Sequence, residues 1–133
     1  MYKNILMPVA LDHDHPVGPS LAIARKLLEP GGRITAIHVI ELMPGYAAQY
    51  LPPDHSETRM QEMRAELKDA VGDDVETVVV SGHPGRAIVD WASDHDADCI
   101  VIASHRPGLQ DYFLGSTAAR VVRHSMASVH VLR

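Results

Sequence analysis

The chain has 133 residues, the usual length of one domain, and can bury a core without disulfides or metal. Its 17 acidic and 12 basic side chains give a net charge of −5, which argues against nucleic acid or an anionic membrane surface as a partner. The single cysteine, Cys99, excludes an internal disulfide and fits a reducing compartment. The sequence shows no signal peptide and no membrane span. We therefore expect a cytoplasmic protein with one domain, residues 1–133.

Apolar runs and helical spacings of apolar residues alternate along the chain. In chain order they predict strand 5–10, helix 20–28, strand 34–40, helix 56–71, strand 75–80, helix 83–92, strand 98–103, helix 116–124 and strand 128–132. The Glu-Pro-Gly-Gly run at 29–32 ends the first helix, and the proline-containing stretch 42–53 is predicted as a long loop.

This strict alternation of strand and helix predicts the fold class. It is typical of an α/β protein with a single, doubly wound parallel sheet, right-handed crossovers and helices on both faces. In such sheets a ligand binds beyond the carboxyl ends of the strands, at the point where the strand order reverses. The segments that follow the strands are therefore the first places to look for a site.

The segment after the fourth predicted strand carries the most informative cluster. Free amides at a helix start attract an anion, glycine admits it closely, and hydroxyl and basic side chains add donors. The cluster of predicted phosphate ligands is Ser104, His105, Arg106, Gly108, Gly115, Ser116 and Thr117. The spacing alone leaves an alternative open, in which Ser116 only caps the helix and Gly115 only makes a turn. Neither a Walker loop nor a dinucleotide glycine motif is present.

Several short motifs occur together along the chain. They are 3–9 at the start, 37–41 on the second strand, 82–84 before the third helix, 114–118, and 128–133 at the end. With these motifs the chain resembles the universal stress protein family over its whole length. The segments 103–107 and 112–116 resemble the branch whose members bind ATP.

The resemblance implies the strand order 3-2-1-4-5 and a stress-response or signalling role exercised through partner proteins. It also implies ATP, with Mg²⁺, as the ligand, and a homodimer that pairs the last strands. No paired carboxylates or activated nucleophile can be placed, so any hydrolysis of ATP is expected to be slow. The Mg²⁺ is expected to be held by phosphate oxygens and water, because no carboxylate cage is visible.

The family pattern also assigns residues near the nucleoside. Pro8, Val9, Ala10 and Asp12 border it, and Val39 lies near the adenine. The glycine pattern Gly-x2-Gly-x9-Gly-Ser/Thr matches at Gly115-Ser116, whereas Ala103 stands at its first glycine and Arg106 near its second, with a spacer one residue shorter. The family's acidic residue near the adenosine is replaced by Ala10, and Asp12 is the candidate to take its role.

Alternatives remain open beside this interpretation. One is a nucleotide-free, dimeric interaction protein of the same fold. Another is a monomer whose last strand is protected by twist and by Arg133. The alternating Asp12-His13-Asp14-His15 segment does not define a metal site, because neighbours in an extended segment point to opposite sides. Cys99 is expected to be buried and inert, and His38 to be hydrogen-bonded within its strand.

Overall fold

The computed structural model describes residues 1–11, 16–41, 55–104 and 114–133. Its elements, in chain order, are β1 (Tyr2–Pro8), α1 (Gly18–Leu27), β2 (Leu28–Ile40), α3 (His55–Val71), β3 (Glu76–Ser81), α4 (Pro84–Asp94), β4 (Cys99–Ala103), α5 (Ser116–His124) and β5 (Ser128–Leu132). The predicted alternation of strands and helices is confirmed.

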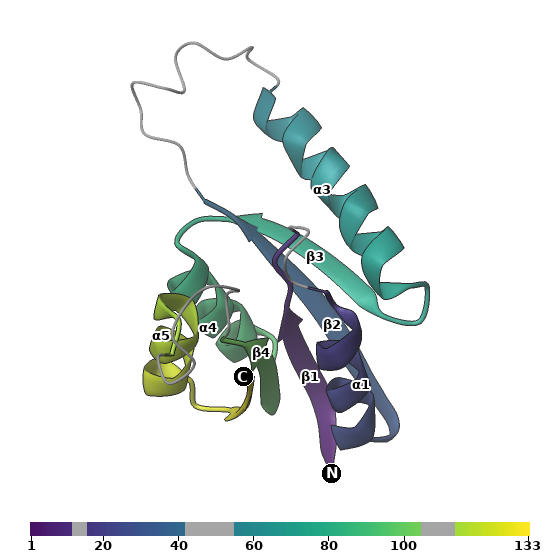
Figure 1. Cartoon of the computed structure of the whole chain (residues 1–133), viewed down its shortest axis with the longest axis vertical. Coiled ribbons are helices and arrows are strands. Elements are labelled where there is room, and N and C mark those ends of the chain that lie inside the picture. The colour runs from purple at the N-terminus through teal and green to yellow at the C-terminus, as the bar shows by residue number, and fades with distance from the viewer. Residues whose placement is uncertain (12–15, 42–54, 105–113) are drawn as a thin grey trace.

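The five strands form one parallel sheet in the order β3-β2-β1-β4-β5 (Figure 1). Each neighbouring pair is parallel, as the β-α alternation requires. The predicted fold class and strand order are therefore confirmed. Between β1 and β4 the direction of strand addition reverses, and this reversal is the switch point at which ligands bind in such sheets.

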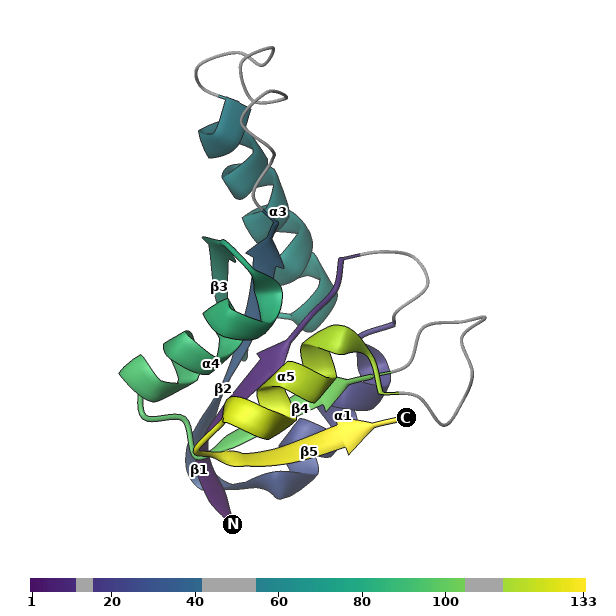
Figure 2. The ribbon, with the colours of Figure 1, turned by 90° about the vertical axis from the view of Figure 1, so that its left-hand side faces the viewer.

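Helices cover both faces of the sheet (Figure 2). Ile5 and Met7 of β1 face one side, where they pack with Ala24 of α1 and Leu67 of α3. Leu6, between them, belongs to the cluster on the other side. The members from the helices there are Ile88, Ala92, Ala118 and Val121 of α4 and α5. The alternation along β1 divides the core into two layers because neighbouring side chains of a strand point to opposite faces.

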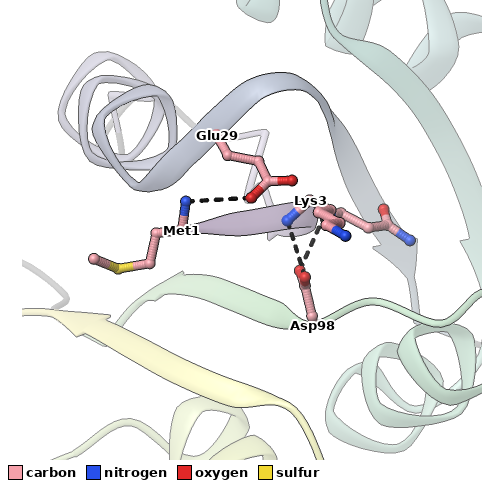
Figure 3. A network of polar contacts seen from close by, with 5 residues as sticks. Met1, Lys3, Glu29 and Asp98 are labelled. Atoms are coloured by element: carbon pink, nitrogen blue, oxygen red, sulfur yellow. Dashed lines mark hydrogen bonds and ion pairs between the residues drawn. The ribbon is translucent and has the colours of Figure 1, made fainter.

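Polar groups bond to one another at the amino ends of the central strands (Figure 3). The Asp98 carboxylate accepts hydrogen bonds from the backbone N–H groups of Lys3, at 2.9 Å, and Asn4, at 3.0 Å. The Asp98 N–H in turn donates to the Asn4 carbonyl oxygen at 3.0 Å. The Met1 ammonium lies 3.6 Å from Glu29 at the start of β2. These contacts fix the start of β1 against β2 and β4.

The bounds of the first two strands differ from the sequence prediction. β1 begins at Tyr2 rather than at residue 5, because its polar start is held by backbone pairing and by Asp98 rather than by apolar burial. β2 begins at Leu28, directly after α1, and not at residue 34. The 29–32 run does end the helix, but it continues as an irregular part of the strand, with a register shift opposite Tyr2 and Asn4. Gly31 has φ 86°, a left-handed conformation that favours glycine.

The other predicted bounds agree within two residues, and those of α5 and β5 agree fully. The predicted loop 42–53 lies outside the described residues. Within the described ranges, no helix combines the length and apolar character needed to cross a bilayer.

Candidate functional site

The site begins where β1 and β4 separate. Their backbones are in register only at Ile5 with Cys99 and at Leu6 with Ile100. Beyond Leu6, β1 stays with β2, and the Val9 N–H still donates to the Ile37 carbonyl at 2.8 Å. A crevice therefore opens at the carboxyl edge of the sheet, at the switch point.

Residues around this crevice line a cavity of about 760 Å³, which we call the main cleft. Every predicted site residue that the structure describes lines it, namely Pro8, Val9, Ala10, Val39, Ala103, Ser104, Gly115, Ser116 and Thr117. They come from the ends of β1, β2 and β4 and from the start of α5. The remaining predicted residues, Asp12, His105, Arg106 and Gly108, lie outside the described residues.

The start of α5 presents its backbone amides to the main cleft. Gly115 is the N-cap residue, in an extended conformation, and within the described residues no side chain caps the helix. Ser116 is the first helical residue and not the cap, so the alternative in which Ser116 caps the helix is wrong. The Ala119 N–H bonds to the Gly115 carbonyl at 2.8 Å, and the amides before it precede the first intrahelical bond. Such amides, with the helix dipole, favour an anion.

Two of the predicted phosphate ligands, Ser104 and Gly115, also have structural roles. The Ser104 hydroxyl donates to the Leu132 carbonyl at 3.2 Å, and the Ser104 N–H donates to the same oxygen at 2.9 Å. Ser104 thus joins the ends of β4 and β5, and its one hydroxyl hydrogen is already used. A Cβ atom on Gly115 would lie only 3.0 Å from the Ser104 carbonyl oxygen. A side chain at residue 115 would therefore press on the end of β4, and this close packing favours glycine there whatever binds beside it.

Sequence reasoning did not assign several residues that the structure adds to the main cleft. Among them are His38 and Glu41 at the end of β2 and Arg59, Met63 and Glu66 on α3. The three α3 residues follow the helical spacing i, i+4, i+7, and this spacing was the sequence signal that they share one helix face. It did not indicate a binding site, because a charged helix face is usually solvated. Only the packing of α3 beside β2 and β3 brings this face to the cleft.

His38 is hydrogen-bonded, as predicted. Its Nδ1 lies 2.8 Å from the Val9 carbonyl oxygen. Because a carbonyl oxygen only accepts, Nδ1 carries the hydrogen, and in the neutral ring Nε2 is left as an acceptor. The half-buried imidazole therefore ties β2 to the end of β1 and adds a polar group to the cleft lining.

The main cleft combines apolar walls with an anion-favouring end. Ile37, Val39 and Ile102 supply apolar surface, and the start of α5 supplies amides and two hydroxyl groups. Among the described residues no group of three or more His, Cys, Asp or Glu could hold a metal ion. The arrangement thus suits a ligand with one flat or apolar part and one anionic part.

A parallel sheet in this order, with a cleft at its switch point, defines a doubly wound α/β fold of the class that binds ligands at the carboxyl ends of its strands. The sequence profile of the universal stress protein family matches residues 1–133, and the chain belongs to this family. Universal stress protein G of Salmonella typhimurium is 29% identical over 145 residues, with all of both chains covered.

Solved structures agree with this assignment. The hypothetical protein MJ0577 is 26% identical, with a TM-score of 0.70 over 99% of this chain and 96% of that one. A universal stress protein solved in complex with cAMP is 23% identical, with a TM-score of 0.62 over 99% and 97% of the two chains. One from Archaeoglobus fulgidus in complex with dAMP is 19% identical, with a TM-score of 0.61 over 99% and 98%. At these identities the last two show the shared fold, and both proteins bind adenine nucleotides.

Proposed function

We propose that the protein binds ATP in the main cleft and acts in stress response or signalling through partner proteins. The observation that carries the proposal is the convergence of all nine described site residues, from four separate elements, on one cleft. The nucleoside lies against Pro8, Val9 and Val39, and the phosphates meet the amides of α5. Family members in complex with cAMP and with dAMP support the choice of an adenine nucleotide.

The donors present fit ATP and not a dedicated metal centre. Ser116 and Thr117 add hydroxyl groups beside the free amides of α5, and Ser116 is exposed to the cleft. The Mg²⁺ arrives with the phosphates and keeps water ligands, because Mg²⁺ binds well to phosphate oxygens and water. We expect slow hydrolysis, because among the described residues that line the main cleft no side-chain nucleophile is hydrogen-bonded to a base.

Calorimetry with ATP and with NAD tests this proposal. We expect ATP to bind and NAD to bind much more weakly, because the sequence has no dinucleotide glycine motif. The nucleotide content of freshly purified, acid-extracted protein provides an independent check. Comparable affinity for NAD, or protein that neither contains nor binds ATP, would contradict the proposal and favour the nucleotide-free class. Ala10, which offers no carboxylate to a ribose, is the residue that favours this alternative.

We also propose that two copies pair through β5. This strand is an edge of the sheet, and its Val129 and Val131 are half-buried within one chain. Two exposed apolar side chains lie nearby in the sequence, Val122 at 46% and Met126 at 99% exposure. Burial between two copies would cover this edge and these side chains.

Sedimentation of the parent and of Met126→Asp at micromolar concentration tests the dimer. Met126 is a better position for a charge than Val131, because Val131 packs against the core and its loss would also weaken the fold. We expect the parent to be a dimer and the variant to dissociate more readily. Thermal melting of the two proteins, compared at concentrations at which both are monomeric, should give the same midpoint if the fold is intact. A monomeric parent would show that the dimer proposal is wrong.

A further inference from the structure

A second depression lies beside the main cleft, and we call it the basic groove. Its volume is about 640 Å³. It is lined by Glu41, by the Gly82–Pro84 turn before α4 and by one face of α5. Glu41, Pro84, Ser116 and Thr117 line both depressions, so the groove and the main cleft meet at the start of α5.

The groove is basic within an acidic protein. Arg120 and Arg123 follow Ser116 at helical spacings of four and seven residues, so all three lie on one face of α5. Both arginines are exposed, and His83 and His124 complete the set of cationic and titratable groups that line the groove with Glu41. The described lining thus carries two arginines against one carboxylate, in a chain whose net charge is −5.

Close packing of α4 and α5 positions Arg120. A Cβ atom on Gly85 would lie 2.7 Å from Cδ and 3.0 Å from Cβ of Arg120. The stem of the arginine therefore lies across the bare backbone of α4, and glycine is needed there. Since the packed stem has already lost much of its freedom, the guanidinium loses less entropy when it binds a ligand.

We propose that the basic groove binds the distal phosphate groups of a nucleotide whose nucleoside part occupies the main cleft. This inference rests on the function proposed above. Arg120 lies about one helical turn, or about 6 Å, beyond Ser116 along the α5 axis. Its side chain is long enough to reach back to a phosphate bound near Ser116. A phosphate chain that passes the α5 amides then meets Arg120 and Arg123, whose guanidinium groups can each bind a phosphate through two hydrogen bonds. The preferred ligand class is a nucleoside triphosphate or a longer polyphosphate, rather than a monophosphate or a cyclic nucleotide.

Calorimetric titration of AMP, ADP and ATP at constant Mg²⁺ tests this inference. Arg120→Gln and Arg123→Gln should each weaken ATP binding about tenfold and leave AMP binding unchanged, because only the longer phosphate chain reaches them. Glu41→Gln should change the ATP-to-AMP affinity ratio in the opposite direction, about threefold, since it removes the carboxylate from the groove. Arg64→Gln is the matched control, because Arg64 is exposed on α3 and lines neither depression.

Two results would overturn the inference. The first is an ATP-to-AMP affinity ratio that is the same in both arginine variants as in the parent. The second is a loss of ATP affinity in Arg64→Gln as large as in the arginine variants of the groove. Inorganic tripolyphosphate separates this failure from that of the proposed function. One outcome is that no nucleotide binds, while tripolyphosphate binds the parent but not the variant that carries both Arg120→Gln and Arg123→Gln. In that case the groove is a site for phosphate chains and the ATP proposal fails. If tripolyphosphate and the nucleotides all fail to bind the parent, both proposals are wrong.

Discussion

The two edges of the same sheet differ in how their polar groups are used. At the amino edge, Asp98 accepts from two backbone amides, and the Asn4 side chain donates to the His95 carbonyl at 2.8 Å. At the carboxyl edge, α5 begins without a side-chain cap among the described residues, beside the exposed Ala10 and Ala103. Polar groups therefore satisfy one another at the amino edge, whereas at the carboxyl edge the first amides of α5 have no hydrogen-bond partner among the described residues.

Parallel topology explains this division. All strands end at the same edge, and each helix that follows a strand begins there, so helix starts and their positive dipole ends gather at the carboxyl edge. The amino edge receives the helix ends and the returning chain, whose polar groups bond to the start of β1, as those of His95 and Asp98 do. The comparison predicts that changes at the amino edge alter stability or reactivity, and that changes at the carboxyl edge alter binding.

The largest effect is expected at Cys99, the first residue of β4. Burial, and secondarily the charge of Asp98, raise the pKa of its thiol from 9.0 to about 11. At pH 8 the folded protein should therefore hold roughly 100-fold less thiolate than the unfolded chain and react correspondingly more slowly with a thiol reagent. Equal reaction rates of folded and denatured protein would show that this edge is open.

The same shift gives a pH dependence. Well below pH 9 the thiol is protonated in both states, so it contributes no change in stability. From about pH 9 to about pH 11 the unfolded chain ionises while the folded protein retains the proton, so the free energy of unfolding should fall with rising pH. Denaturant unfolding of the parent and of Cys99→Ala across this range should show a smaller decline in the variant.

Asp98→Ala should have the next largest effect. It removes the acceptor of two charge-assisted hydrogen bonds to the backbone of β1, at a cost of about 2–3 kcal/mol in the free energy of unfolding. Urea unfolding measures this loss, and Asp69→Ala, an exposed acidic residue on α3, is the control for the change in charge. ATP affinity of the folded variant should be unchanged, and a large loss of affinity would contradict the division between the edges.

Gly115→Val tests the carboxyl edge. Its Cβ would press on the Ser104 carbonyl oxygen and its branched side chain would crowd the α5 amides, so ATP affinity should fall about tenfold or more. Gly18→Val is the control at the start of α1, where a Cβ would meet no heavy atom within 4 Å in the described structure. Thermal melting without ligand measures the packing cost separately. Unchanged affinity in folded Gly115→Val would place the phosphates elsewhere.

Ser116→Ala should have the smallest effect, a loss of about 0.5–1.5 kcal/mol in ATP binding from one hydroxyl donor. Because Ser116 is the first helical residue and Gly115 is the cap, the free energy of unfolding without ligand should change by only a few tenths of a kcal/mol. Calorimetry with ATP and unfolding of the free protein together measure both values. A large loss of stability with unchanged binding would restore a purely structural role for Ser116.

The sequence by itself determined the elements and the edge that carries the site. Apolar periodicity is a local property, so it located α5 and β5 fully and the other elements closely, except for the starts of β1 and β2, and the alternation implied the parallel sheet. It also indicated the strand ends and the Gly115-Ser116 helix start, since carboxyl ends of parallel strands share one edge. The strand order itself came from family resemblance.

Only the tertiary structure decided contacts between residues distant in sequence. Backbone pairing with Tyr2 starts β2 at Leu28, although the glycine and proline at 30–32 favour a turn. The early separation of β1 from β4 opens the main cleft, and Ser104 uses its hydroxyl on β5 instead of leaving it for a ligand. In the basic groove, Arg120 can lie against α4 because residue 85 is a glycine. Such contacts depend on how the elements pack against one another. A local pattern of residues does not specify which distant residues will be brought into contact.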